Sequence, residues 1–333
     1  MRAEGEDNLG LEAPQTLDPP HSLGVAVLPT SARSLPVAGS VSGTVRRVYP
    51  KALEFVDHAA AMGGYASSLG GLFLFLSIFL LYLGFWFELV PLILFSIFKI
   101  WISLIFIQVD WIGFRYHPVL VNRATQKVHV FASGLLPWWQ WGWNLLGRPP
   151  SEVHTYDWDR IRGEIVQVST FTGQIVRREQ GLVFAVTESP GSPKVVERFG
   201  VGTMDGYGLI DGLLSRWEFI RAFMRNEGPL WRLGDGLYAE ETEGFWESLL
   251  FLQPMHWLIT DPSTRGQWWM WPLAVMMLIG LPLTAYIGLM RYLSGRFKRE
   301  PVWPKEVLES LGGSLLTEAE LLAMASAEAD ESR

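Results

Sequence analysis

The chain has 333 residues, 49% of them hydrophobic, with 16 Trp and 19 Phe, which is more apolar bulk than an ordinary soluble domain uses. It contains no cysteine, which excludes disulfide scaffolds, thiolate zinc sites, iron–sulfur clusters and cysteine nucleophiles. The formal net charge of −7 argues against nucleic acid as a partner, because nucleic-acid binding needs a basic face.

Residues 1–45 are predicted to be a disordered tail. They begin acidic and contain prolines that break any periodicity. Their only apolar run, Gly24 to Leu28, is too short for the core of a signal peptide. A juxtamembrane segment, residues 46–68, follows this tail.

Two apolar runs, Leu69 to Phe87 and Leu89 to Val109, predict a transmembrane helical hairpin over residues 69–109. The first run carries no charge, and as a helix it would span about 28 Å, close to the hydrocarbon thickness of a bilayer. Lys99 lies midway along the second run. We expect it to face a helix partner or to snorkel; an ion-transfer site is the alternative.

Residues 110–244 are predicted to form a β-rich soluble domain. Apolar residues alternate around Val119 and around Val130, on either side of the turn-like segment 122–127, which predicts a β-hairpin. Further short strand-like segments follow. Apolar residues at helical spacing then predict an amphipathic helix from Leu209 to Arg225, with Trp217 packed on the sheet.

This order of elements, with YDWDRI at Tyr156 to Ile161, resembles a pleckstrin-homology-like domain and the small bacterial membrane-tethered domains of that type. The resemblance implies an antiparallel β domain closed by a C-terminal helix. The expected fold class is therefore an integral membrane α+β protein.

Residues 245–290 are predicted to be a C-terminal membrane region. The run from Trp268 to Met290 predicts a membrane helix. The shorter segment from Phe245 to Thr260 is either another crossing, giving a helical hairpin, or an interfacial helix. Residues 291–333 form a basic and then acidic helical tail, in which Thr317 and Glu320 have the spacing of a capping box.

Basic residues flank both ends of the predicted helical hairpin and follow Met290, and they indicate the cytoplasmic side. They are Arg46, Arg47, Lys51, Arg115, Arg123, Lys127, Arg291, Arg296, Lys298 and Arg299. Four spans satisfy all of these signals; three spans, with the central domain outside, are the alternative. We expect a multi-pass protein of the bacterial inner membrane with its central domain in the cytoplasm.

Two groups of residues are candidates for a binding or membrane-facing surface. One is the Trp cluster Trp138, Trp139, Trp141 and Trp143, which is either a hydrophobic plug under the β domain or a loop resting on the bilayer or on a partner. The other is the set Arg160, Arg162, Arg177 and Arg178, which could meet anionic lipid headgroups or form a solvated strand face.

Sequence motifs of catalysis are missing: the chain has no HExxH, GxSxG, Walker loop or GxGxxG. No catalytic, metal or cofactor-binding residue is therefore predicted, and no cofactor is expected. One metal alternative combines His117 and His129 with Asp157 or Asp159.

A broader resemblance covers most of the chain. It is carried by NRATQKVHVF (Asn122 to Phe131), DW (Asp157, Trp158), VVERFGVG (Val195 to Gly202), WEFIRAFM (Trp217 to Met224), FWESLL (Phe245 to Leu250) and VWPKEV (Val302 to Val307). These segments are similar to an uncharacterised proteobacterial membrane-protein family, the domain-of-unknown-function family 6708. The resemblance implies genes beside type VI secretion effectors, and it supplies no catalytic residues.

The expected function is that of a non-enzymatic inner-membrane protein displaying a β-rich binding domain. The resemblance implies an accessory or immunity protein, whose partners would be the lipid bilayer and another protein, an effector or secretion component. The alternative is a membrane-bound enzyme acting on lipid or cell-envelope precursors. Acidic or His residues converging in a pocket at the membrane face would favour the enzyme, and a transporter subunit is a third possibility.

Overall fold

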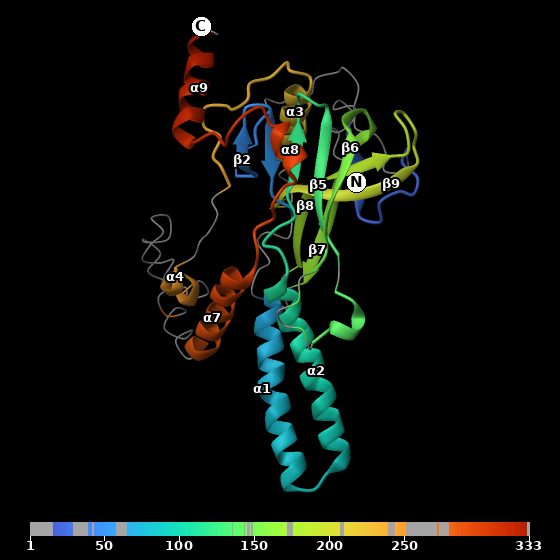
Figure 1. Cartoon of the computed structure of the whole chain (residues 1–333), viewed down its shortest axis with the longest axis vertical. Coiled ribbons are helices and arrows are strands. Elements are labelled where there is room, and N and C mark those ends of the chain that lie inside the picture. Colours follow the sequence, from blue (N-terminus) through green and yellow to red (C-terminus); the bar gives the residue numbers. More distant parts are fainter. Residues whose placement is uncertain are drawn as a thin grey trace.

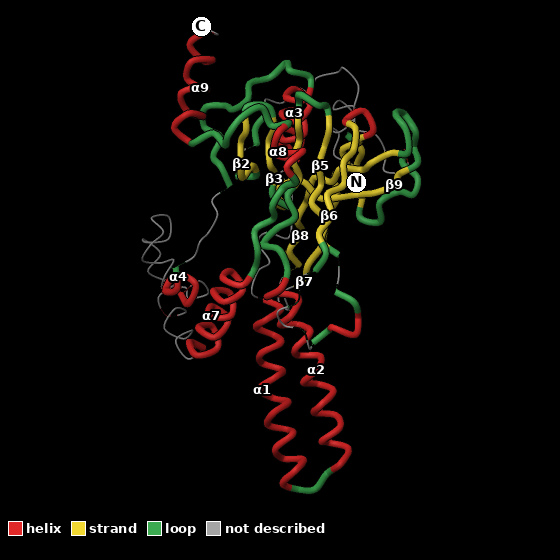
Figure 2. The backbone as a smooth tube through the Cα atoms, viewed as in Figure 1, coloured by secondary structure: helices red, strands yellow, loops and turns green. Residues whose placement is uncertain are grey.

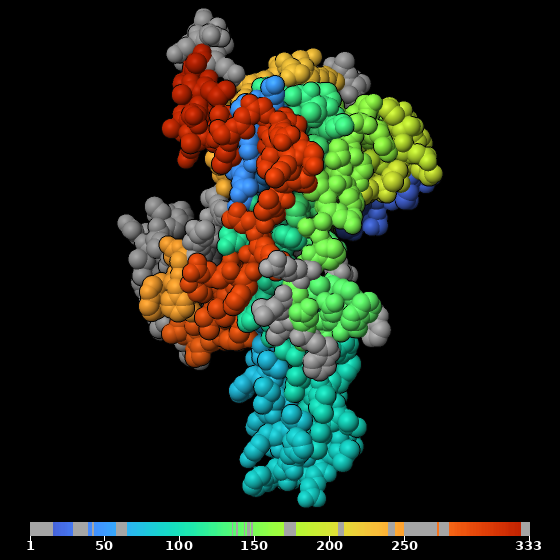
Figure 3. All heavy atoms as spheres, viewed as in Figure 1, coloured from blue at the N-terminus to red at the C-terminus, as the bar shows by residue number. Residues whose placement is uncertain are grey.

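The computed structural model of the chain is a mixed α+β structure, in which a helix pair projects from a β-rich part (Figures 1 and 2). The residues it describes are 16–28, 39–41, 43–57, 65–134, 136–142, 144, 147, 149–171, 176–206, 210–238, 244–250, 272 and 280–331. Figure 3 shows the β-rich part and the helix pair as separate masses joined at one end of the helices.

The helix pair consists of α1 (Tyr65–Trp86) and α2 (Val90–Ile112), packed against each other. Small side chains lie in the contact, and a Cβ added at Gly84 would come within 2.9 Å of the Ile93 side chain. The large apolar side chains therefore point outward. Both helices are long and apolar enough to cross a membrane, with mean hydropathies of 2.1 and 2.4, as the sequence predicted.

Lys99 is half-buried, and its ammonium lies 5.4 Å from the ring centroid of Phe73 on α1 and 5.7 Å from that of Phe95. It thus faces the partner helix, which is the simpler of the two interpretations of this residue.

Two antiparallel sheets make up the β-rich part. The first has the order β2-β3-β4-β5-β6, with strands β2 (Val45–Tyr49), β3 (Ala52–Phe55), β4 (Val119–Asn122), β5 (Lys127–Ser133) and β6 (Ser151–Asp157). The second has the order β1-β7-β8-β9, with β1 (Gly24–Val27), β7 (Ile161–Phe171), β8 (Val176–Thr187) and β9 (Val195–Gly206). The predicted hairpin is β4–β5, in which Val119 pairs with Val130.

The helix pair interrupts the first sheet. Strand β3 ends at Phe55, the chain then forms α1 and α2, and it returns as β4, which pairs with β3 along its whole length. The β-rich part therefore includes strands that precede the helices, β1 to β3, and is not confined to residues 110–244 as the sequence suggested. Strands β2 and β3 pair locally as a short hairpin, in which Tyr49 pairs with Ala52, but β3 acquires its second partner, β4, only across the inserted helices.

Helix α3 (Ile210–Met224) closes the domain. Its Trp217 is 1% exposed, and its ring centroid lies 5.7 Å from that of Trp158 and 5.6 Å from that of Phe184. The predicted helix and the packing of Trp217 on the sheet are both confirmed.

The prediction of a wholly disordered N-terminal tail is wrong for the described residues 16–28. Strand β1 pairs with β7, and Leu17, Val27 and Leu28 are buried. The apolar run at Gly24 to Leu28 is too short to form structure alone, but β7 offers it an edge to pair with.

The C-terminal part contains α4 (Phe245–Leu250), α7 (Leu281–Phe297), α8 (Lys305–Glu309) and α9 (Glu318–Glu331). Helix α7 lies beside the domain-proximal half of α1 (Figure 1), and Tyr286 donates a hydrogen bond of 2.9 Å to the carbonyl oxygen of Ser68. Residues 251–260 of the predicted segment Phe245 to Thr260, and residues 268–271 and 273–279 of the segment Trp268 to Met290, lie outside the described residues.

The chain after α7 packs into the β domain. Trp303, Val307 and Leu311 form a hydrophobic core with Leu120 and Phe131. The Trp303 indole donates a 2.7 Å hydrogen bond to the buried Glu54 carboxylate. At α9, Thr317 and Glu320 form the predicted capping box, with the Thr317 N–H 2.7 Å from Oε2 of Glu320.

Candidate functional site

Three polar side chains meet at one end of the first sheet. Phe55 on β3 pairs with Val119 on β4, which pairs with Val130 on β5. Continuing from these pairs toward the helix pair, the chain reaches Asp57 after β3, His117 before β4 and Ser133 at the end of β5. The register of the sheet therefore gathers residues that are far apart in the sequence.

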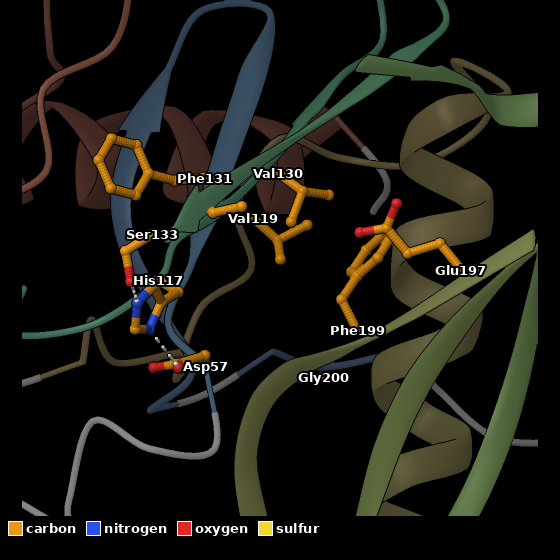
Figure 4. Close-up of a pocket in the computed structure, with 10 residues that line it drawn as sticks. Asp57, His117, Val119, Val130, Phe131, Ser133, Glu197, Phe199 and Gly200 are labelled. Carbon is orange, nitrogen blue, oxygen red and sulfur yellow. Dashed lines mark hydrogen bonds and ion pairs between the residues drawn. The ribbon is translucent and has the colours of Figure 1, made fainter. Parts of the chain in front are cut away.

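The His117 ring lies between the other two side chains (Figure 4). Its Nε2 is 2.6 Å from Oγ of Ser133, and its Nδ1 is 3.3 Å from Oδ2 of Asp57. A carboxylate only accepts hydrogen bonds, so in the neutral ring the proton lies on Nδ1, which donates to Asp57. Nε2 then has no proton and accepts a hydrogen bond from the Ser133 hydroxyl.

This trio borders a pocket of about 270 Å³. Its walls are mostly apolar, from Val119, Val130, Phe131 and Phe199. The second carboxylate oxygen of Asp57, Oδ1, is buried and has no hydrogen-bond partner among the described residues. The carboxylate's described hydrogen bond is thus the one to the imidazole.

Across the pocket from His117 lies Glu197 of β9 (Figure 4). The Tyr156 hydroxyl on β6 donates a hydrogen bond to Oε2 of Glu197, and Nδ1 of His154 lies 3.4 Å from the same oxygen. The pKa of Tyr156 is raised, first by burial and then by the hydrogen bond and negative charge of Glu197. The far wall of the pocket is therefore acidic, with its carboxylate held by the edge strand β6.

The pocket lies at the end of the β domain from which the helix pair leaves. Asp57 stands shortly before α1 and His117 shortly after α2, and both helices extend away from this end of the sheet (Figure 1). An acidic residue and a His thus converge in a pocket at the helix-facing end of the domain, which is the arrangement expected of the enzyme alternative.

The predicted Trp cluster lies on the loop between β5 and β6, which docks on α2. The short helix η4 (Trp138–Gln140) begins the loop's contact. The Gln108 side chain on α2 donates to the carbonyl oxygens of Gln140, at 3.0 Å, and Asn144, at 2.9 Å, and accepts from the N–H of Gly142 at 2.7 Å.

The four Trp residues differ in their surroundings. Trp139 is 63% exposed. Trp141 is half-buried; its indole donates to Leu136, and its carbonyl accepts from Trp101 of α2 at 2.9 Å. The side chain of Trp138 and all of Trp143 lie outside the described residues. The described part of the loop therefore packs against α2.

The four predicted arginines do not form one patch. In the β7–β8 pairing, Arg162 faces Ala185 near one end, whereas Arg177 and Arg178 face Thr170 and Ser169 near the other. Seven residues of strand separate these positions, about 23 Å at ~3.3 Å per residue. Arg160 donates to the carbonyl oxygen of Thr187 at 2.8 Å, beside Arg162.

The metal alternative is not supported within the described part of the chain. No group of three or more His or acidic side chains there could hold an ion. His117 bonds Asp57 and Ser133, whereas Nδ1 of His129 lies 2.9 Å from the Thr155 hydroxyl. Burial first, and then the charge of Lys127, lower the pKa of His129 to about 4, so it is neutral at pH 7.

Sequence reasoning missed Asp57 and Ser133. Asp57 lies in the segment assigned to the membrane approach, and Ser133 lies at a strand end without a GxSxG surrounding. The one signal that could have found them is the pairing of β3 with β4, which depends on recognising β3 across the helix pair.

Comparison with known proteins gives one match. The model of a family described as a family of unknown function (DUF6708) matches residues 96–311, well over half of the chain. No curated protein and no solved structure matches it. The chain belongs to the DUF6708 family.

Proposed function

We propose that this DUF6708 member is an inner-membrane protein that displays its β-rich domain, pleckstrin-homology-like in character, for binding another protein. The observation that carries the proposal is the surface of the helix pair. Only 22% and 17% of the most apolar windows of α1 and α2 are buried. A core hairpin of a soluble protein would be covered on most of its surface, so a lipid environment fits better.

The dimensions and the aromatic residues of the pair also support a span. The 23 residues of α2 are about 35 Å long at ~1.5 Å each, against about 30 Å of bilayer hydrocarbon. Tyr82 and Trp86 lie at the far turn, with ring centroids 6.1 Å apart. At the domain end, Trp111 stacks on Phe297 at 4.9 Å. Aromatic rings at both ends match the belts that mark membrane interfaces.

The packing of the C-terminal segment supports an even number of crossings. Trp303 follows α7 and contacts Glu54, which precedes α1. A domain built from both segments has to lie on one side of the bilayer. The chain between residues 245 and 297 then leaves and returns, which fits the four-span arrangement or an interfacial helix pair.

Basic residues gather at the domain end of the helices and support a cytoplasmic domain. Arg115 donates a 2.6 Å hydrogen bond to Gly295, and Phe114 forms a parallel bridge with Arg299. The basic groups after α2 and after α7 therefore flank the same membrane face, the pattern of a cytoplasmic side. The proposed setting is a type VI secretion effector locus, in which the partner is the effector or a secretion component.

Extraction and co-purification test the proposal. We expect the full-length chain to stay in the membrane pellet at alkaline pH in carbonate and to require detergent. We also expect it to co-purify with the product of an adjacent effector gene when the two are co-expressed. Release by carbonate would contradict the membrane assignment, and failure to retain any adjacent gene product would contradict the binding role.

A second function is favoured by a specific observation. The contacts among Asp57, His117 and Ser133 support the alternative of a membrane-bound enzyme acting on lipid or cell-envelope precursors.

A further inference from the structure

We propose that Ser133 is a nucleophile activated by His117 and Asp57, and that the adjoining pocket accepts a carboxylic ester with a short apolar acyl group. The inference stands on side-chain geometry and on the pocket, and it does not depend on membrane anchoring or on a protein partner.

The geometry meets the requirement for an activated serine. A nucleophile and its base have to lie within hydrogen-bond reach, with the base oriented by a third group. Ser133 and His117 are 2.6 Å apart, and Asp57 lies 3.3 Å from the other ring nitrogen. Such a trio is recognised by geometry and roles and not by sequence order, so the missing GxSxG does not exclude it.

The burial of the three side chains suits these roles. The Asp57 side chain is 15% exposed and the His117 side chain 37% exposed, and Ser133 is half-buried at the pocket wall. A largely buried carboxylate directed at the ring stabilises the imidazolium that forms when His117 takes a proton. The more exposed ring and hydroxyl remain open to a bound ester.

The chemical step follows from these positions. Oγ of Ser133 attacks the ester carbonyl carbon, and its proton passes to Nε2 of His117. The C–O bond to the leaving alcohol then breaks, and the proton on Nε2 goes to the departing oxygen. Water attacks the acyl-Ser133 ester in the same way, so that a carboxylic acid leaves and the serine is restored.

The pocket walls indicate the substrate class. Val119, Val130 and Phe131 come from the first sheet, and Phe199 from the second. The side chains of Val119, Val130 and Phe199 favour an acyl chain, and a volume of about 270 Å³ suits a short one. Glu197 on the far wall disfavours an anionic acyl group.

The first experiment measures covalent modification. Full-length protein in detergent is treated with a fluorophosphonate probe, and the modified residue is identified by peptide mass spectrometry. A phosphonofluoridate brings its own leaving group, so labelling reports the nucleophilicity of the serine directly. We expect labelling at Ser133, none in Ser133→Ala, and labelling slowed at least about 100-fold in His117→Gln.

Matched variants separate chemistry from folding. Ser189→Ala removes an exposed serine on the β8–β9 turn and should label like the wild type. Asp57→Asn should slow labelling while the helix content and the unfolding midpoint stay within error. Absence of labelling at Ser133 in folded wild-type protein, or equal labelling in His117→Gln, would overturn the proposal.

A second experiment separates two sources of the ester. Hydrolysis of water-soluble p-nitrophenyl butyrate is compared with release of fatty acid from phosphatidylglycerol vesicles carrying the reconstituted protein. We expect Ser133-dependent hydrolysis of the soluble ester. Hydrolysis of the vesicle lipid alone would overturn the short-acyl assignment, and hydrolysis of neither would overturn the ester assignment.

Discussion

Oδ1 of Asp110, near the end of α2, lies 2.9 Å from the ammonium of Lys298, which caps the C-terminal end of α7. The same carboxylate accepts hydrogen bonds from the Ser67 N–H at 3.0 Å, the Ser67 hydroxyl at 2.8 Å and the Ser294 hydroxyl at 3.0 Å. One buried carboxylate thus holds the N-terminal end of α1 and the C-terminal ends of α2 and α7 together. This end of the three helices is also the end that carries the β domain.

The first prediction concerns this ion pair. Lys298→Ala leaves the buried Asp110 without its cation and should lower the free energy of unfolding by about 3 kcal/mol, because loss of one partner strands a buried charge. Lys194→Ala breaks the exposed pair with Glu188 and should cost under about 1 kcal/mol. Denaturant unfolding in detergent measures both. Equal losses in the two variants would show that the pair does not hold α7 in place.

The second prediction concerns the domain core. Trp217→Ala should cost about 3–5 kcal/mol, because it removes a fully buried ring that packs on Trp158 and Phe184. Trp139→Ala, which truncates an exposed ring, should cost far less. The loss of near-ultraviolet circular dichroism during unfolding reports the core. A variant Trp217→Ala as stable as Trp139→Ala would contradict the packing described above.

The elements that the sequence predicted well are those with a local signal. Helix α3 carries its own apolar periodicity, and the β4–β5 hairpin carries alternation on both sides of a turn. The apolar runs of α1 and α2 are long enough to identify both helices, by length and composition, as candidate membrane spans. In each case the information lies within about twenty residues.

The elements that the sequence missed depend on distant partners. Strand β1 needs the edge of β7, and β3 needs β4 across the inserted helices. The candidate site depends on the pairing of β3 with β4. Asp57 and Ser133 come together only through this long-range pairing, so no short sequence motif contains them. Trp303 was assigned to the basic and then acidic helical tail, although its ring packs in one core with Leu120 and Phe131, more than 170 positions earlier in the chain.

The third prediction concerns His129 and pH. Its pKa is about 4 in the folded protein and about 6.5 when unfolded, so between these values the unfolded chain binds more protons. The stability that neutral His129 contributes is therefore present above pH ~6.5 and is lost as the pH falls toward 4. At pH ~5 the loss should reach about 2 kcal/mol relative to neutral pH.

His129→Gln removes this titration and keeps a group able to bond Thr155. Other titrating groups, such as the buried Glu54, whose pKa burial raises, are shared by the wild type and the variant and cancel in the difference. We expect the wild type to lose about 2 kcal/mol more of its unfolding free energy than the variant as the pH falls from about 7 to about 5. Parallel pH profiles for the two proteins would show that His129 titrates normally in the folded state.

The last prediction concerns sidedness. The native chain has no cysteine, so a single introduced cysteine is the only one that a membrane-impermeant maleimide can label. Ser189→Cys reports the β domain, Glu309→Cys reports α8, and Glu88→Cys reports the turn of the helix pair; all three positions are exposed. Because α8 packs into the β domain, positions 189 and 309 have to lie on the same side.

We expect cells with a permeabilised outer membrane to show labelling of Glu88→Cys alone, and disruption of the inner membrane to expose the other two cysteines. Labelling of Ser189→Cys without Glu309→Cys would establish three spans and contradict the packing of Trp303 beside Glu54. Labelling of both, with Glu88→Cys protected, would keep an even number of crossings but place the domain outside the cytoplasm. The basic residues around Arg115 and Arg299 would then lie on the periplasmic side, although Lys and Arg are usually enriched on the cytoplasmic side. Immunity to a periplasmic toxin would become the better-supported role.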